Sequence, residues 1–428
     1  MTKHAKKSDH LQLVEGPQTA TVEIPLPLLG AFRDIERSFF DLCIDAGQQV
    51  LASMMEQDRE DLCGARWKRD PERRAGRAGT TQSEVTLGGR RIAIRRPRAR
   101  SQEGEELSLP SFGFASSRDP LDRHTLDAVA CGVSARKYAR SLDRLPEDID
   151  ERSVSRSSVS RRYVAMTTKQ LTTWLTKPLG DRHFPIVMID GIILGDHTVL
   201  IALGIDIEGK KQVLGLREGD TENSRVAKAL LRDLVERGLD PDRARLFVID
   251  GAKALRSGIG KVFGDLGVVQ RCQVHKQRNI LGHLPDGMHE SVKTILREAW
   301  SLHDAKLARA RLERLASSLQ ADHPGAAASV REGLEETLTV QGLGIDGTLY
   351  RKLRSTNAIE NLNSGIAGYS KNVKRWQGGS MVVRWVSAAI VEAEKKFRRV
   401  QGCRDIEKLV RALSVFEAKE EATAERVA

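Results

Sequence analysis

The chain has 428 residues, 40% of them hydrophobic and 30% charged, and its formal net charge is +11. This length allows two or three domains with full cores, no apolar run is long enough to cross a membrane, and the polar segment 1–16 lacks the apolar core of a signal peptide. Five scattered cysteines argue against a disulfide framework and fit a reducing cytoplasm.

The N-terminal part of the chain is basic. Residues 1–28 are expected to be weakly ordered, and apolar residues at three- and four-residue spacing predict a helix over 29–63. The segment 64–100 then holds 12 Lys/Arg and 3 Asp/Glu, a net charge of 12 − 3 = +9. It includes "SEVTLGGRRIAIRR", two alternating runs joined by Gly88-Gly89, which indicate a β-hairpin.

This basic patch favours binding to a polyanion, most commonly nucleic acid, and the alternative is a solvated surface loop. We therefore interpret region 29–115 as a helical and β-hairpin DNA-binding region. Its candidate DNA contacts are Arg90, Arg91, Arg95 and Arg96.

The acidic, glycine-containing stretch "SQEGEELSLPSFG" (101–113) predicts a loop, with a domain boundary near 105–118. Beyond it, residues 116–180 have helical patterns interrupted at Gly132 and at the connector "PEDIDER". Short Ser and Arg side chains at the start of a helix suit phosphates and base edges. The pattern predicts a helix-turn-helix-like DNA-binding domain, and the alternative is a small surface bundle. The candidate contacts are Ser134, Arg136, Lys137, Ser155, Arg156, Ser158, Arg161 and Arg162.

From residue 181 the pattern changes to strands, expected at 185–194, 197–206, 210–217, 245–250 and 267–272, with helices at 224–237 and 252–263. The first three strands can pair as an antiparallel meander, whereas the later ones need helical crossovers. The fold class is therefore α/β with a mixed sheet. A helical insertion follows at 276–343, then helices at 357–369 and 380–399, and a tail at 401–428 whose polar end, from Glu417, is expected to fray.

Two of these strands end in the same way, one in Asp190-Gly191 and the other in Asp250-Gly251. An Asp at a strand end is often only a turn former. The repeat on strands that should be neighbours favours a shared role instead. Two close carboxylates repel each other unless one is protonated or a cation bridges them, and Mg²⁺ prefers carboxylate oxygens.

Glu360 is the best candidate for a third acid. Its helix has an apolar face and a polar stripe without Lys or Arg, formed by Asn357, Glu360, Asn361 and Ser364. The alternative is a capping box between Asn357 and Glu360. A triad of the three acids implies two-metal phosphoryl transfer, in which Asp190 bridges two ions and Asp250 and Glu360 hold one each.

Further candidates follow the last strand. Cys272-x-x-His275 lacks the second ligand pair of a structural zinc site, so Cys272 is expected to pack. His275, Lys276 and Arg278 are expected to approach phosphate near the acids. Trp300 is a candidate for stacking on an unpaired base, with core packing as the alternative.

Five segments together resemble the mutator-type DDE transposases of bacterial insertion sequences: "VMIDG", "LFVIDGAKAL", "QRCQVHKQRN", "RSTNAIENLNSGI" and "RWQGGSMVVRW". The resemblance covers about 31–400, and the spacings between the acids, 250 − 190 = 60 and 360 − 250 = 110, agree with it. It implies an RNase H-like core (181–275 and 344–400) interrupted by the helical domain, and N-terminal elements that recognise terminal inverted repeats.

The resemblance also implies the chemistry. It makes Asp190, Asp250 and Glu360 the catalytic acids, aligns Cys272 and His275 with a Cys-x-x-His signature, and implies strand cleavage and joining with two Mg²⁺ ions, for which Mn²⁺ can substitute. The small departures from the family pattern remove no needed group.

The sequence thus predicts a transposase that binds the inverted repeats of its element, nicks DNA and joins the 3′-OH to a target phosphodiester. The expected partner is double-stranded DNA, bound by a homo-oligomer that is at least dimeric, in the bacterial cytoplasm at the nucleoid and without a membrane. Two rivals are an RNase H-like nuclease without joining activity and a non-catalytic DNA-binding repressor or domesticated copy. The presence of all three acids weighs against the second rival.

Overall fold

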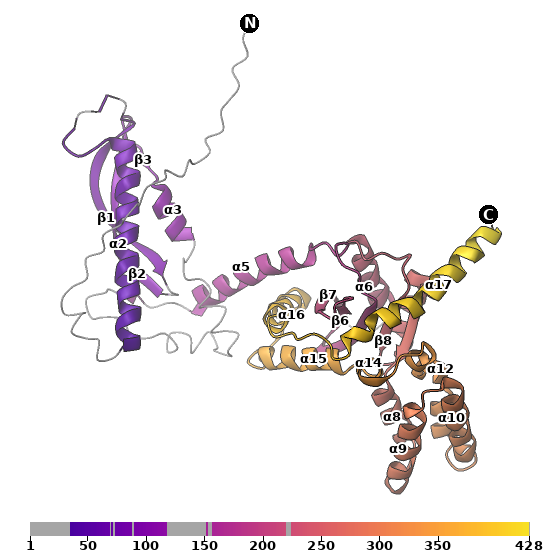
Figure 1. The fold of residues 1–428 in the computed structure, drawn as a ribbon. Coiled ribbons are helices and arrows are strands. Elements are labelled where there is room, and N and C mark those ends of the chain that lie inside the picture. The colour runs from indigo at the N-terminus through magenta and orange to yellow at the C-terminus, as the bar shows by residue number, and fades with distance from the viewer. Residues whose placement is uncertain are drawn as a thin grey trace. The chain divides into compact units, whose positions relative to one another are not determined.

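The structure is a computed structural model that describes residues 35–68, 70–71, 73–87, 90–117, 151–152, 156–219 and 224–427. Among these residues it divides into two compact units, of which the first ends at Ser160 and the second begins at Arg161. Figure 1 draws both units, from indigo at the N-terminus to yellow at the C-terminus. Four residues proposed to contact DNA lie outside the described residues: Ser134, Arg136, Lys137 and Ser155.

The first unit packs a long helix against a hairpin (Figure 1). Helix α2 (Ile35–Cys63) precedes strands β1 (Ala75–Leu87) and β2 (Arg90–Ser101), which pair antiparallel along their length. The predicted hairpin is confirmed, and it is longer than the alternating apolar pattern indicated. Cys63 is buried together with Ala75 and Ala99, so small residues let the helix approach the strands closely.

The loop predicted over 101–113 is only partly correct, because the turn at 102–105 is followed by regular structure. This stretch forms β3 (Glu106–Leu107), which pairs with β2, and helix α3 (Pro110–Ser117). The N–H of Ser111 in the first turn of α3 donates to Asp58 Oδ2 of α2 at 2.7 Å, which satisfies one free donor of the helix start. A further short strand, β4 (Glu151–Arg152), also pairs with β2.

The second unit is built on a five-stranded mixed sheet in the order β7-β6-β5-β8-β9. Strands β5 (Ile186–Leu194), β6 (His197–Ile205) and β7 (Lys211–Gly219) form the predicted antiparallel meander. Strand β8 (Arg245–Ile249) runs parallel to β5, and β9 (Gly267–Arg271) runs parallel to β8. The crossovers contain α6 (Ser224–Glu236) and α7 (Lys253–Phe263), the latter followed by a 3₁₀ turn, η2 (Gly264–Leu266). The mixed α/β sheet is therefore confirmed.

Helices cover both faces of this sheet. Side chains of a strand alternate between faces, so Val187 and Ile189 pack with α6 and α7, whereas Ile186 and Met188 pack with the C-terminal helices. The C-terminal helices are α14 (Gly347–Leu353), α15 (Asn357–Ser370), α16 (Gly379–Glu394) and α17 (Ile406–Val427). Both faces of the central strand are buried, which explains its continuous apolar sequence.

The predicted helical stretch between β9 and α14 has its own core. It contains α8 (Gln273–Leu281), α9 (Asp286–Ser301), α10 (Ala305–Leu319), α11 (Pro324–Arg331), α12 (Leu334–Thr337) and α13 (Thr339–Gly342). Leu296, Leu312 and Leu315 lie at the centre of this core, and α8, α9 and α10 lie together at one end of the unit (Figure 1). Asp304 caps α10, since its carboxylate accepts from the N–H groups of Lys306 and Leu307.

The C-terminal end differs from the predicted frayed tail. After a 3₁₀ turn, η3 (Cys403–Asp405), helix α17 continues to Val427. Ile406, Leu409 and Leu413 are buried in the same core as the sheet, because they recur at three- and four-residue spacing on one side of the helix. The predicted domain end at residue 400 is therefore too early for this core.

The second unit also includes most of α5 (Arg156–Leu175), whose predicted start near Ser155 agrees with the structure. The ring of Tyr163 lies 4.8 Å from the ring of Trp385 on α16. In the described part of the chain, none of the helices combines the length and the apolar character that crossing a bilayer requires.

Candidate active site

Asp190 and Asp250 lie on neighbouring strands of the sheet. Asp250 directly follows β8, as predicted, whereas Asp190 does not end its strand: β5 continues past it to Leu194. Ile189 of β5 pairs with Ile249 of β8, and each acid directly follows its member of that pair. Parallel neighbours place equivalent residues about 5 Å apart. Alternation also directs both acids to one face: Met188 lies two residues before Asp190, and it packs on the face that α15 covers.

The chain turns sharply after Asp250. Asp250 Oδ1 accepts from the N–H of Ala252 at 2.8 Å, so the turn-former interpretation holds for one of its two oxygens. Gly251 has φ +103°, and a Cβ there would lie 2.0 Å from Nε of Arg271. Arg271 in turn donates to the carbonyl and the carboxylate of Glu332. Only glycine fits this turn, which fixes where Asp250 leaves the strand.

Asn363 connects helix α15 to β5. Its Nδ2 donates to Asp190 Oδ2 at 2.9 Å and to the carbonyl of Gly191 at 3.4 Å. Its Oδ1 is buried, with no hydrogen-bond partner among the described residues. The bond orients one oxygen of Asp190. It also ties α15 to β5, so that Glu360, one turn earlier on α15, lies on the same side of the sheet as Asp190.

The pKa of Asp190 is raised to about 6. Burial is the main cause, and the negative charges of Asp250 and, more weakly, Glu360 add to it. The N–H of Gly191 and the nearby His275 act in the opposite direction. Since Coulomb interactions weaken with distance, the three acids and His275 lie within electrostatic range of one another. Crowded carboxylates of this kind are typical of cation sites and of catalytic acids.

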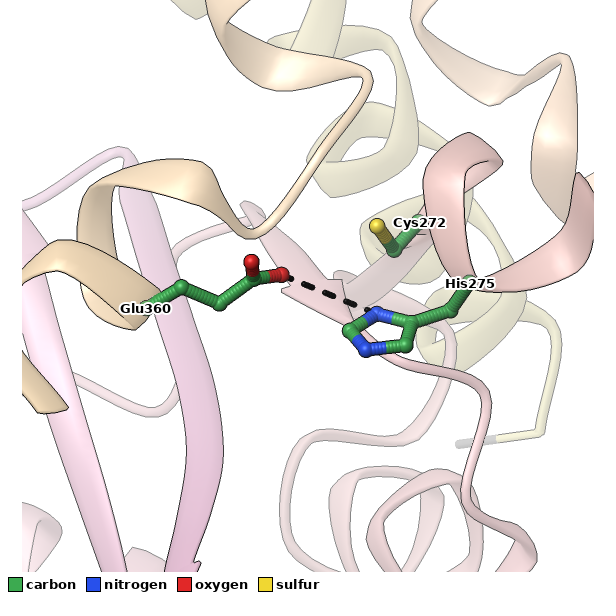
Figure 2. Close-up of side chains that lie close together, drawn as sticks. All are labelled: Cys272, His275 and Glu360. Atoms are coloured by element: carbon green, nitrogen blue, oxygen red, sulfur yellow. Dashed lines mark ion pairs between the residues drawn. The ribbon is translucent and has the colours of Figure 1, made fainter. Parts of the chain in front are cut away.

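Glu360 faces a second group of side chains. Figure 2 shows its carboxylate pointing toward His275, with Cys272 beside them at the start of α8; Oε1 of Glu360 lies 3.8 Å from Nδ1 of His275. Thr356, fully buried at the start of α15, joins the group. Its hydroxyl donates to Glu360 Oε1 at 2.6 Å and lies 3.3 Å from the Cys272 sulfur. Because Thr356 rather than Asn357 is the N-cap, the capping-box alternative is wrong.

Electrostatic coupling runs through this group. Hydrogen bonding to Cys272 raises the pKa of His275, with a smaller effect of Glu360 in the same direction, and burial opposes the shift. Burial favours the neutral thiol of Cys272, but hydrogen bonds with His275 and Thr356 outweigh it and lower the thiol pKa. One ligand atom each from Cys272, His275 and Glu360 lies within 4.8 Å of the others. A closed structural zinc site needs four donors, and this group supplies three.

The sequence is similar to known proteins over most of its length. The family model described as "Transposase, Mutator family" matches residues 31–400, most of the chain. The chain belongs to the Mutator family of transposases.

Three relatives are similar over most of their length. The transposase for insertion sequence element IS256 in transposon Tn4001 of Staphylococcus aureus is 25% identical over 358 residues, 80% of this chain and 87% of the relative. The transposase for ISRM5 of Rhizobium meliloti (strain 1021) is 27% identical, covering 86% of this chain and 91% of the relative. The transposase for IS1081 of Mycobacterium tuberculosis is 24% identical, with coverages of 87% and 89%. The chain is thus a member of a family of enzymes that cut and transfer DNA.

The residues predicted to approach phosphate have different surroundings in this transposase. His275 is half-buried at the acids, and Arg278 is exposed on α8. Lys276 is 1% exposed and bonds to Glu332, so in this structure it is a buried ion-pair partner and not a phosphate contact. Trp300 is 4% exposed inside the helical core, so the structure favours packing over the stacking interpretation.

The basic residues of the transposase's hairpin also divide into two groups. Arg95 is exposed, and Arg91 is exposed with Glu84 at 3.3 Å. Arg96, in contrast, donates to Glu106 at 2.7 Å and lies 4.7 Å from the ring centre of Phe112. Arg161 is exposed on α5. The side chains of the remaining candidates, Arg90, Arg156, Ser158 and Arg162, lie outside the described residues.

Sequence patterns missed two residues of the transposase's site. Asn363 lies outside the polar stripe predicted on α15, whose members Asn357, Asn361 and Ser364 are exposed. Asn363 is a polar residue next to the buried side chains of Leu362 and Ile366. The signal available in the sequence was an amide beside the apolar face of this helix. Thr356 carried no periodic signal, because it precedes the helix.

Proposed function

We propose that this transposase binds the terminal inverted repeats of its insertion sequence, cleaves DNA strands and transfers the exposed 3′-OH to a target phosphodiester. The observation that carries the proposal is the proximity of three acids from separate segments: Asp190 in β5, Asp250 after β8 and Glu360 on α15. The raised pKa of Asp190, caused by burial and by Asp250, supports a cation as the missing partner of these acids.

The donor set fits magnesium. Three carboxylates, one within β5, one directly after β8 and one on α15, offer hard oxygen ligands, and the buried, unpartnered Oδ1 of Asn363 offers a further polar atom at Asp190. Asp190, Asp250 and Glu360 would hold two Mg²⁺ ions, which Mn²⁺ can replace. When bound, such ions activate the attacking hydroxyl and offset charge on the leaving oxygen of an in-line displacement.

The remaining groups assist by position and charge. Asn363 orients one oxygen of Asp190 through its 2.9 Å bond, and the Gly251 turn fixes Asp250. His275, whose pKa is raised by its bond to Cys272, stands beside Glu360 where a phosphate would approach. Thr356 holds Glu360 in its orientation through a hydrogen bond of 2.6 Å.

The proposed organisation follows from these assignments. Residues 181–275 and 344–400, completed by the core residues of α17, form an RNase H-like catalytic core, for which the strand order β7-β6-β5-β8-β9 is the supporting observation, and 276–343 form the helical insertion. Residues 29–115 and 116–180 bind double-stranded DNA. The enzyme acts as a homo-oligomer, at least a dimer on DNA, at the nucleoid in the bacterial cytoplasm.

The test uses the full-length protein and a linear duplex carrying the DNA that flanks its reading frame, incubated with Mg²⁺, followed by mapping of nicked and joined strands. Asp190→Asn, Asp250→Asn and Glu360→Gln should each reduce joining by at least about 10³-fold, since metal-held charge stabilisation amounts to several kcal/mol. Asp196→Asn, at an exposed acid in the β5–β6 turn, is the matched control and should leave joining unchanged. Wild-type joining by Asp190→Asn and Asp250→Asn refutes the proposal, and cleavage without joining identifies a plain nuclease.

A further inference from the structure

Trp67, just after α2, has the most exposed large hydrophobic side chain among the described residues. Its indole is 97% exposed, and its neighbours Arg66 and Lys68 are exposed as well. Full burial of an aromatic side chain stabilises a fold by about 2–3 kcal/mol, and this position forgoes that contribution.

The backbone at Trp67 is in an unfavourable conformation. Its φ is 65°, and it is the one non-glycine residue with positive φ in the described part of the chain. Lys68 N–H donates to the carbonyl of Ala65 at 3.3 Å, so Trp67 is the third residue of a tight turn, a position where glycine or asparagine is normal. A left-handed conformation costs an ordinary L-residue about 1–2 kcal/mol.

Several bonds hold this turn in place. Gly64, with φ +77°, donates to the carbonyl of Glu60 at 2.7 Å and accepts from Arg77 at 3.1 Å. On the other side of the turn, Arg74 N–H donates to the carbonyl of Leu62 at 3.0 Å. The surrounding structure therefore presents the indole outward on a braced turn rather than on a mobile loop. A strained, exposed and well-supported aromatic residue indicates a binding role.

The charge around the turn selects the ligand. Trp67 lies within the segment 64–100, whose net charge is +9, and a cation stands on each side of it in the sequence. An aromatic ring between two cations matches the backbone and bases of nucleic acid, because the cations bind phosphates while the ring stacks on an unpaired base. An apolar protein partner would not need the flanking charges.

We propose that Trp67 is a stacking platform for an unstacked base of DNA, with Arg66 and Lys68 holding the adjoining phosphates. This inference rests on the proposed function, since it takes DNA as the partner of the first unit. It adds a contact that recognises distorted or opened DNA by base stacking, in a manner that does not depend on base identity.

The test measures equilibrium binding of the full-length protein to two labelled 30-base-pair duplexes, one intact and one with two unpaired thymines at its centre. Trp67→Ala should bind the bulged duplex about tenfold more weakly and the intact duplex within about twofold of wild type, while Trp67→Phe should lose less. Trp67→Gly removes the ring and relieves the positive φ, so it should lose binding with a melting temperature no lower than wild type. Leu307→Ala, at an apolar side chain 59% exposed on α10, is the control.

Salt dependence separates stacking from charge. Arg66→Ala and Lys68→Ala should each flatten the dependence of binding on salt, whereas Trp67→Ala should leave that slope unchanged. Equal binding of the bulged duplex by Trp67→Ala and wild type overturns the inference, as does an equal loss on both duplexes. A changed oligomeric state with unchanged DNA affinity overturns it in favour of a protein contact. Failure of the wild type to bind either duplex instead refutes the DNA-binding part of the proposed function.

Discussion

Replacing Asn363 by alanine tests whether the site depends on the orientation of Asp190. The substitution removes a 2.9 Å bond to the Asp190 carboxylate and a weaker 3.4 Å contact to Gly191. A hydrogen bond to a charged group contributes about 1.5–3 kcal/mol, equivalent to about 10- to 150-fold. Loss of a residue that orients a metal ligand typically costs about 10- to 100-fold. We therefore expect strand joining to fall by about 10- to 100-fold.

Two further measurements isolate the cause. The Mn²⁺ concentration that half-saturates the protein, followed by calorimetry, should rise by a similar factor, because Asp190 becomes free to rotate away. Stability should change little, since the same substitution removes a buried Oδ1 that lacks a partner. Asn361→Ala, on the exposed side of the same helix, is the matched control. Wild-type joining and metal affinity in Asn363→Ala, or an equal loss in Asn361→Ala, would refute the reasoning.

Three other predictions concern stability. Gly251→Ala should lower the free energy of unfolding in urea by more than about 1–3 kcal/mol, because φ is +103° and the new Cβ meets Arg271, whereas Gly287→Ala, with open space around it, should be nearly neutral. Asp190→Asn should raise the melting temperature in EDTA at pH 7.5 and have no such effect near pH 4. The pKa of this carboxyl is about 6 in the folded protein against an ordinary 3.8, so its ionisation lowers the stability of the fold as pH rises through that window. An equal effect of the substitution at both pH values contradicts this origin. Leu409→Ala, in the core, should cost about 2–5 kcal/mol in urea unfolding, and an effect as small as that of exposed Val415→Ala would show that α17 does not support the sheet.

The sheet was predictable because its strands carry strong local signals. Uninterrupted apolar runs such as the one before Asp190, bounded by turns, indicate strands buried on both faces, and their spacing fixes which connections are hairpins and which are crossovers. The C-terminal helix was harder to predict. The polar end dominates the composition of this helix. Three residues anchor the helix to the sheet, Ile406, Leu409 and Leu413, and their role is visible only once the face of the sheet that they cover is known.

The three candidate acids could be identified from the sequence, whereas the residues around them could not. Two Asp-Gly pairs that each follow an apolar run on neighbouring strands identify themselves by repetition, and Glu360 follows from the resemblance and from its helix. Thr356 contacts Cys272, 84 positions earlier in the chain, and Asn363 contacts Asp190, 173 positions earlier. No periodicity in the sequence indicates such a contact. The turn at Trp67 was missed because a positive φ at tryptophan contradicts local propensity.

Opposing effects on the ionisation of Asp190 link the stability of the site to its proposed chemistry. Burial and Asp250 oppose ionisation of Asp190, while the Gly191 N–H, His275 and the amide of Asn363 favour it, so the protein holds the carboxylate close to the point where a proton and a cation compete. A site built only for stability would pair each acid with its own arginine. Arg271 does not serve in this way: its guanidinium packs on Gly251 and bonds to Glu332. The guanidinium of Arg271 is therefore committed to the turn, and a divalent ion is the partner that would offset the repulsion between Asp190, Asp250 and Glu360.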